Sequence, residues 1–225
     1  MVYGLSCFAE IRDKKKLKIM SVGCGPCTEL AAVDYLRNEG VLNYDQLDYR
    51  GIDPLGDVWK RIWTDIKTYF GDGIQFYPND ILQLVDIIVK HSWVPDVLIF
   101  QYVFSDMYKH SNEEEIIQFI NKLAGFLNLY DEKPIYILCN DINLSKSMGG
   151  GREFFDILES KVENPKIVRK MHFDNINRDR HYEYGDQYNS NALVFNNITD
   201  DIRNAYNPFE SCASAQILIK KERSD

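Results

Sequence analysis

Residues 21–29 read Ser-Val-Gly-Cys-Gly-Pro-Cys-Thr-Glu, and this stretch decides how the chain folds. It completes an apolar run over 17–22 that is typical of a buried β-strand. Gly23 and Gly25 allow the sharp turn by which a chain leaves such a strand. Residues 28–39 then carry apolar side chains at helical spacing. The sequence therefore predicts a strand, a glycine turn and a helix in direct succession.

The same alternation of strand and helix continues along the chain. Strands are predicted over 17–22, 46–52, 73–77, 96–102, 134–140, 166–173 and 215–221, and helices over 28–39, 58–70, 81–91, 113–129 and 152–162. Spacings of this kind suit crossover connections between parallel strands. We therefore expect an α/β fold built on one doubly wound, mostly parallel sheet of about seven strands.

The chain has 225 residues, a suitable length for one large domain. Residues 174–214 break the alternation and are rich in Asn, Asp, Arg and Tyr. We interpret 1–225 as a single domain with an insertion at about 174–214. The net charge of −8 argues against broad electrostatic capture of nucleic acid.

Cysteine usage and the N-terminus indicate the compartment. Five cysteines form no secreted disulfide framework, so reduced thiols are expected. No run approaches the roughly 20 apolar residues that span a bilayer, and no signal peptide is evident. The sequence predicts a cytoplasmic protein without a membrane partner.

Polar residues follow several predicted strands. Asp53 ends the second strand, Asp80 follows the third, and Gln101 and Tyr102 end the fourth. Ligands of doubly wound sheets bind beyond these carboxyl ends, at the switch point beside the first strand. A carboxylate there can accept both hydroxyls of a ribose, and another can reach the amine of an adenine.

In this order the motifs resemble those of the class I S-adenosylmethionine (SAM)-dependent methyltransferases. The resemblance covers roughly residues 17–141 and implies a Rossmann-like sheet whose last strand is antiparallel, with SAM as cofactor. Its first motif corresponds to residues 22–26 and its fourth to residues 96–102. The cofactor-binding residues that it implies are Gly23, Cys24, Gly25, Pro26, Asp53, Asn79, Asp80, Ile81, Gln101 and Tyr102.

The chain departs from the family pattern in three places. Ser21 stands where the family often has an acidic residue, and Cys27 replaces the third glycine of the turn. Only 16 residues precede Leu17, where most members carry a helical cap over the cofactor. The cap is therefore expected to be short, absent, or supplied by a partner protein or self-association.

A second pattern overlaps the turn, because residues 24–27 spell the Cys-Gly-Pro-Cys of thioredoxins. A helix N-terminus can stabilise a thiolate at such a site. However, thioredoxins have an aromatic residue where this chain has Gly23, and neither Pro78 nor Pro95 sits where their cis-proline is needed. The number of crossovers is also too high for that small fold. We interpret the match as coincidence.

Methyl transfer needs positioning and, for some acceptors, a general base. Candidates beside the strand ends are Tyr102, Asp106, Asn140 and Asp141. Each has a structural alternative, such as capping a helix or holding a loop. The four histidines show no metal-ligand spacing, so no metal site is predicted.

The sequence predicts a SAM-dependent methyltransferase acting on an unidentified acceptor. A small-molecule acceptor suits the acidic charge and the aromatic strand ends. Two alternatives remain open: methylation of RNA or a ribosomal component, and a SAM-binding module without catalysis.

Overall fold

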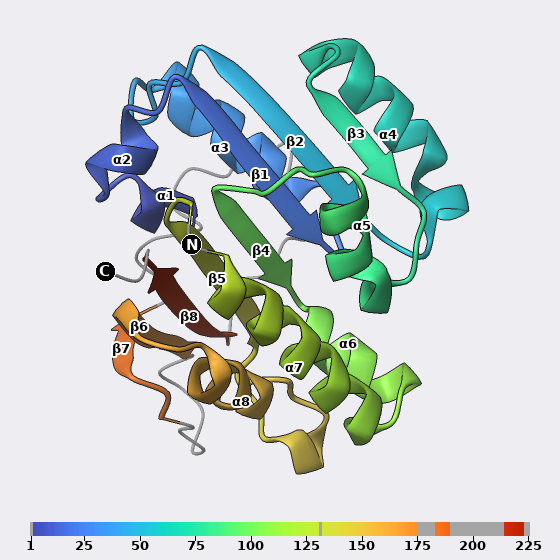
Figure 1. The fold of residues 1–225 in the computed structure, drawn as a ribbon, viewed down its shortest axis with the longest axis vertical. Coiled ribbons are helices and arrows are strands. Elements are labelled where there is room, and N and C mark those ends of the chain that lie inside the picture. The colour runs from blue at the N-terminus through green and yellow to red at the C-terminus, as the bar shows by residue number, and fades with distance from the viewer. Residues whose placement is uncertain (1, 131, 175–182, 190–213, 223–225) are drawn as a thin grey trace, which may run out of the picture.

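The computed structural model describes residues 2–130, 132–174, 183–189 and 214–222. The strands are β1 (Lys16–Val22), β2 (Gln46–Ile52), β3 (Ile74–Tyr77), β4 (Val97–Gln101), β5 (Ile135–Ile142), β6 (Pro165–Asp174), β7 (Asp186–Asn189) and β8 (Ser214–Lys221). They form one sheet in the order β3-β2-β1-β4-β5-β8-β6-β7 (Figure 1). The doubly wound α/β prediction is confirmed, with eight strands rather than about seven. The added strand is β7, which lies within the predicted insertion.

Strand direction follows the expected pattern. β1 pairs in parallel with both β2 and β4, and β4 pairs in parallel with β5. β8 runs antiparallel to β5 and β6, as predicted for the last strand. Because β1 lies between β2 and β4, the chain winds outward from β1 in both directions. The switch point of the sheet is therefore at the carboxyl ends of β1 and β4.

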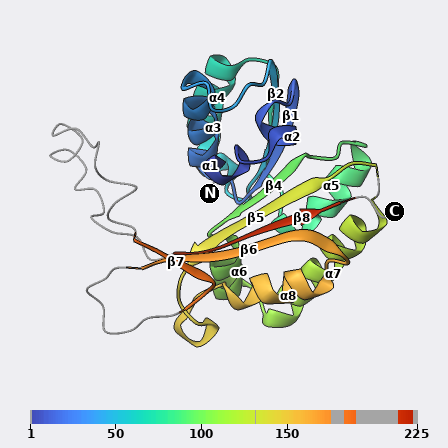
Figure 2. The same ribbon diagram turned by 90° about the vertical axis from the view of Figure 1, so that its left-hand side faces the viewer.

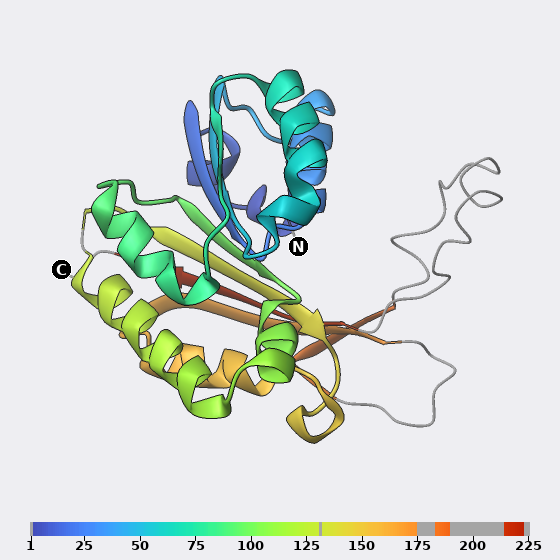
Figure 3. The ribbon, with the colours of Figure 1, turned by 90° about the vertical axis from the view of Figure 1, so that its right-hand side faces the viewer.

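Helices cover both faces of the sheet (Figure 2). They are α1 (Val2–Leu5), α2 (Ala9–Arg12), α3 (Thr28–Asn38), α4 (Gly56–Phe70), α5 (Leu84–Lys90), α6 (Val103–His110), α7 (Glu113–Leu129) and α8 (Glu153–Lys161). Short 3-10 turns, η1 (Ile81–Gln83) and η2 (Lys146–Met148), precede α5 and α8. α1–α4 pack on one face and α5–α8 on the other. Figure 3 shows these two layers from the opposite side.

The alternation of side chains along β1 explains why both faces are apolar. Leu17 and Ile19 join the core beneath α3, whereas Met20 and Val22 join the core beneath α5 and α7. A strand buried on both faces reads as a continuous apolar run, which is the pattern seen in the sequence. This packing fixes the end of β1, and with it the glycine turn.

The start of α7 could be predicted from the sequence, whereas the start of α6 could not. α7 begins where predicted, because Asn112 Oδ1 accepts the Glu115 N–H at 2.9 Å while the Glu115 carboxylate accepts the Asn112 N–H at 3.2 Å. This reciprocal capping box is visible in the sequence. α6 was not predicted, and its N-cap, Tyr102, makes no side-chain capping bond.

Candidate functional site

The turn after β1 is held against β2. Gly23 and Gly25 have φ of +62° and +46°, in the left-handed region that glycine adopts without strain. The N–H groups of Gly23 and Cys24 both donate to the Ile52 carbonyl, at 2.8 and 3.2 Å. The backbone of the turn is therefore fixed to the end of the second strand, beside Asp53.

Asp53 is buried and organises the turn from the other side. Its Oδ2 accepts the Gly25 N–H at 2.9 Å, and its Oδ1 accepts the Leu55 N–H at 2.8 Å. Two such bonds orient the carboxylate and leave further lone pairs for a ligand. Asp53 thus joins the turn to the start of α4.

Two tryptophans of α4 flank Gly25. Trp63 Nε1 donates to the Gly25 carbonyl at 2.9 Å. Trp59 Cζ2 and Cε2 lie 3.7 and 3.8 Å from the position that a Cβ on Gly25 would take. Trp59 Nε1 is buried and has no hydrogen-bond partner among the described residues. The sequence showed both only as apolar residues of a helix, although their spacing of four placed them on one face.

The two cysteines of the turn lie beneath it. A Cβ on Gly51 of β2 would stand 2.6 Å from Cys24 Sγ, so the thiol packs closely on that glycine. Cys24 and Cys27 are free thiols, both buried. The hydrogen bond with Cys27 and burial raise the pKa of Cys24 far above its ordinary value. A redox-active pair needs a lowered pKa, so this geometry does not favour the thioredoxin interpretation.

A cleft of about 700 Å³ opens at the carboxyl ends of β1 and β4. It is lined by Gly23, Gly25, Asp53, Pro54, Leu55, Trp59, Asp80, Ile81, Leu82, Gln101, Tyr102, Val103, Ser105, Asp106, Met107, Lys109, His110, Ser111 and Ile142. Eight of the predicted site residues are therefore brought together: Gly23, Gly25, Asp53, Asp80, Ile81, Gln101, Tyr102 and Asp106. Cys24, Pro26, Asn79 and Asp141 are not among the lining residues.

Beyond β3, Asp80 and Asn79 play different parts. Asp80 Oδ1 caps η1 by accepting the Leu82 N–H at 2.9 Å, and the side chain is exposed at the cleft. The Asn79 amide instead donates to Gln83 Oε1 at 2.9 Å. Asp80 can therefore still reach a ligand.

The turn after β4 forms the opposite wall. Tyr102 has φ of +59° and is 41% exposed, an unusual conformation for a bulky residue. Its N–H donates to the Asn140 carbonyl at 2.7 Å. Ser105, in the first turn of α6, donates its N–H to Asp141 Oδ2 at 2.8 Å. The end of β5 therefore holds this turn at two points.

Asp141 lies behind the cleft rather than in it. The side chain is fully buried, and its Oδ1 accepts the Ile142 N–H at 2.7 Å. Burial raises its pKa above the ordinary value. This placement suits a residue that positions α6. Asp106, in contrast, is exposed at the cleft and lies 3.8 Å from Lys109 Nζ.

These residues fit a nucleoside cofactor with an anionic end. α3 begins at the turn, and the N-terminus of a helix carries unpaired N–H groups and partial positive charge. Asp53 and Asp80 offer acceptors for hydroxyl and amine groups, and Trp59 offers a donor that nothing in the described chain satisfies. In the described ranges, no three His, Cys, Asp or Glu side chains gather as a metal site would require.

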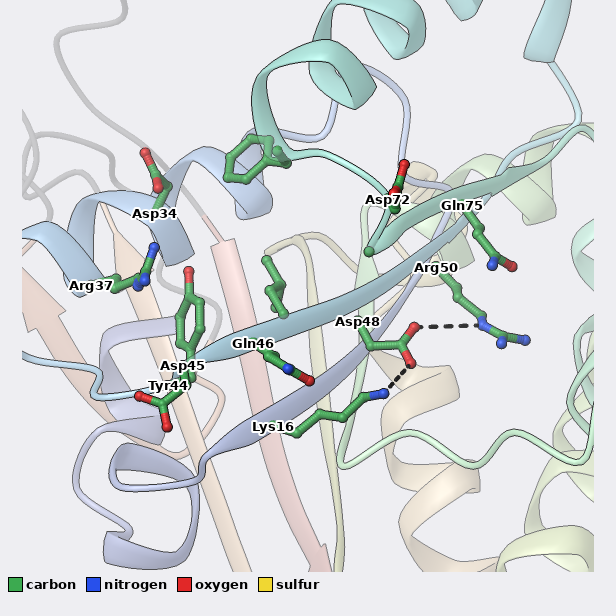
Figure 4. A pocket seen from close by; sticks show the side chains of 13 residues that line it. Lys16, Asp34, Arg37, Tyr44, Asp45, Gln46, Asp48, Arg50, Asp72 and Gln75 are labelled. Atoms are coloured by element: carbon green, nitrogen blue, oxygen red, sulfur yellow. Dashed lines mark ion pairs between the residues drawn. The ribbon is translucent and has the colours of Figure 1, made fainter.

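A second hollow, of about 480 Å³, shares no lining residue with the cleft. In Figure 4, Asp48 of β2 lies between Lys16 and Arg50, at 3.5 and 3.9 Å. Four aspartates and three cations line this hollow, and Asp48 is the aspartate that pairs with two of those cations. Eight of the predicted site residues line the cleft and none lines this hollow, so we place the functional site in the cleft.

No protein-family model matches the chain. No curated protein matches it either. Among solved structures, a possible exported protein from Bordetella parapertussis is 10% identical with a TM-score of 0.53, covering 98% of this chain and 67% of that one. A SAM-dependent methyltransferase from Archaeoglobus fulgidus is 12% identical with a TM-score of 0.49, covering 98% and 92%. A precorrin-6y C5,15-methyltransferase from Geobacter metallireducens is 10% identical with a TM-score of 0.46, covering 96% and 86%.

Identities this low bear on the fold alone. Among the residues that the structure describes, no helix is long and apolar enough to cross a membrane. The strand order, with β1 at the switch point and an antiparallel β8, agrees with the resemblance read from the motifs. The chain has an α/β fold built on one doubly wound, mostly parallel sheet, and it shares this fold with the Bordetella protein.

Proposed function

We propose that this protein is a SAM-dependent methyltransferase with a small-molecule acceptor. One observation carries the proposal. The glycine turn, Asp53 and Asp80 come from three separate loops and line one cleft at the switch point of the sheet. A nucleoside requires such a set of acceptors in that place.

Each part of the cofactor has a counterpart in the cleft. Asp53 would accept the ribose hydroxyls, and Asp80 the exocyclic amine of the adenine. The turn at Gly23 and Gly25, with the N-terminus of α3, would hold the amino-acid end, where N–H groups favour a carboxylate. Ile81 and Gln101 complete the wall of this pocket.

SAM supplies a methyl group activated by its sulfonium. The chain has to hold the acceptor in line with that group and exclude water, which can provide effective molarities of ~10⁵–10⁸ M. Tyr102 and Asp106 line the same cleft, and either could take a proton from an acceptor that needs a base, Asp106 as its carboxylate and Tyr102 as its phenolate. Asp141 would act through α6 as a positioning residue.

The distribution of charge favours a small acceptor over RNA. Lys14, Lys18 and Lys133 gather around Asp96, which precedes β4 and so lies at the opposite end of the strand from the cleft. A polyanion would gain little from these lysines while docked at the cleft. A cap from a partner or a second copy fits the proposal, because the cleft is open.

Calorimetric titration with SAM and S-adenosylhomocysteine tests the proposal. We expect both to bind, and Asp53→Ala to weaken binding roughly tenfold or more, because a bond to a charged group contributes about 1.5–3 kcal/mol. Asp45→Ala is the matched control, since this exposed aspartate pairs with Lys15, at 3.4 Å, and does not line the cleft. Absence of binding to the wild-type chain would refute the proposal.

A methyl-transfer assay distinguishes an active enzyme from a SAM-binding module without catalysis. Methyl-labelled SAM incubated with a panel of phenol, amine and carboxylate acceptors should yield a labelled product. If the label moves to RNA and not to small acceptors, the acceptor is RNA, and the assignment of SAM as cofactor stands.

A further inference from the structure

We propose that the indole N–H of Trp59 donates a hydrogen bond to a ribose hydroxyl of the cofactor. This inference rests on the proposed function. It assigns a binding role to a residue that the motifs of the turn do not include. It begins from one buried donor that has no partner among the residues that the structure describes.

The three tryptophans of the chain differ in this respect. Trp63 Nε1 donates to the Gly25 carbonyl at 2.9 Å, and Trp93 Nε1 donates to Asp48 Oδ2 at 2.9 Å. Trp59 Nε1 is buried with no partner in the described part of the chain. Buried polar groups almost always find a partner, so this exception needs an explanation.

The position of Trp59 supplies the explanation. Its side chain lines the cleft, and Cζ2 and Cε2 of its ring lie 3.7 and 3.8 Å from the place of a Cβ on Gly25; Cε2 is bonded to Nε1. Gly25 is also the residue whose N–H binds Asp53, at 2.9 Å. The ring of Trp59, which carries the unpartnered donor, and the proposed ribose acceptor Asp53 therefore both lie beside Gly25. Nε1 is itself buried, so the proposal requires the ring to turn until the N–H reaches a ligand in the cleft.

The chemistry of a hydroxyl requires this pairing. A hydroxyl donates one hydrogen bond and also has lone pairs that accept. An ionised Asp53 can only accept, so it accepts the hydrogen bond that the hydroxyl donates. The lone pairs of the hydroxyl oxygen are then left without a donor. An indole N–H can only donate. Asp53 and Trp59 together therefore satisfy a hydroxyl in both directions, which neither does alone.

Trp59→Phe tests the bond, because it keeps an aromatic ring and removes the donor. The probes are S-adenosylhomocysteine and 5′-methylthioadenosine, which share the ribose but differ in the amino-acid end. We expect the variant to bind both about tenfold more weakly, in line with the loss of one buried hydrogen bond. Trp93→Phe, which removes an indole from the other end of the sheet, should leave both affinities unchanged.

The outcomes separate this inference from the proposed function. If the wild-type chain binds neither probe, the proposed function fails before Trp59 is tested. If the wild-type chain binds and Trp59→Phe binds equally well, the inference is wrong. If only S-adenosylhomocysteine binding weakens, the N–H serves the amino-acid end, and the ribose assignment is wrong.

A measurement on the wild-type chain does not depend on how the variant folds. Nuclear magnetic resonance of ¹⁵N-labelled indoles should show three side-chain signals. Adenosine should shift the Trp59 signal downfield, while the Trp93 signal stays in place. The shift should vanish with either 2′-deoxyadenosine or 3′-deoxyadenosine, whichever lacks the contacted hydroxyl. An unmoved Trp59 signal in the presence of bound adenosine would overturn the inference.

Discussion

The turns that follow β1 and β4 share one backbone conformation, but the residue that adopts it is buried in the first turn and partly exposed in the second. Each places a residue other than glycine in the left-handed region at the start of a helix: Cys27 with φ of +61° before α3, and Tyr102 with φ of +59° before α6. Cys27 is buried at 2% exposure, whereas Tyr102 is 41% exposed. Burial offsets the strain in the first turn. The second turn carries the same strain at a residue that lines the cleft, and strained residues gather at functional sites.

The two turns also rest on different buried carboxyl groups. Glu29, in the first turn of α3, accepts a hydrogen bond from the Tyr49 hydroxyl at 2.5 Å. Asp141 accepts two backbone N–H groups instead, one of them from Ser105. Burial raises the pKa of both groups. The Glu29 carboxyl accepts from a neutral side chain, whereas the Asp141 carboxyl accepts from two backbone N–H groups. Replacing each carboxyl by its neutral amide should therefore affect stability differently.

The largest expected effect comes from Gly23, where the two turns touch. A Cβ there would lie 2.8 Å from Val103 Cγ2, the first residue of α6, and φ is +62°. Gly23→Ala should therefore lower the free energy of unfolding by about 1–3 kcal/mol, through strain and through separation of the turns. It should also weaken SAM binding. Urea denaturation and calorimetry measure the two effects.

Gly40→Ala is the matched control for this prediction. Gly40 has φ of +69° with nothing within 4 Å of a Cβ, so it carries the backbone strain without the clash. It should lose about 1 kcal/mol and leave SAM binding unchanged. Equal losses at the two glycines would show that contact between the turns contributes nothing.

Sequence patterns predicted the elements that depend on residues close together in the chain. They did not predict features that depend on contacts between residues far apart in the sequence. β1, α3 and α7 follow from apolar periodicity and local capping. α6 has eight residues and no capping side chain, so no local signal marks its start. The sequence predicts Asp141 as a catalytic candidate, and that prediction is untested; its contact with Ser105, 36 positions away, has no local signal. The role of Trp59 likewise depends on how α4 meets the turn.

An intermediate effect is expected at Glu29, from its titration. Because burial raises its pKa in the folded state above the ordinary 4.5, the folded chain binds more protons than the unfolded chain. The free energy of unfolding therefore falls as pH rises from about 4.5 through the folded pKa. Glu29→Gln removes this loss and can still accept the Tyr49 bond. Its stability relative to wild type should therefore rise with pH over this range.

Asp141→Asn should behave in the opposite way. An amide offers one acceptor, so its NH₂ would face a backbone N–H that the carboxylate now satisfies. The variant should lose stability throughout the same pH range despite the raised pKa of Asp141. Denaturant midpoints measured from pH 4 to 8 compare the two variants, and parallel curves would remove the distinction between the two carboxyl groups.

The smallest expected effect is at Tyr102 itself. Tyr102→Gly relieves the left-handed strain and gives up a ring that is 41% exposed, so its free energy of unfolding should stay within about 1 kcal/mol of wild type. Tyr102→Ala keeps the strain and should be about 1 kcal/mol less stable than the glycine variant. Thermal melts of both, beside Cys27→Gly, measure the difference. Cys27→Gly should lose more than Tyr102→Gly, because its thiol is packed in the core. A large loss at Tyr102→Gly would make the ring a structural residue, and its strain would then need no ligand to explain it.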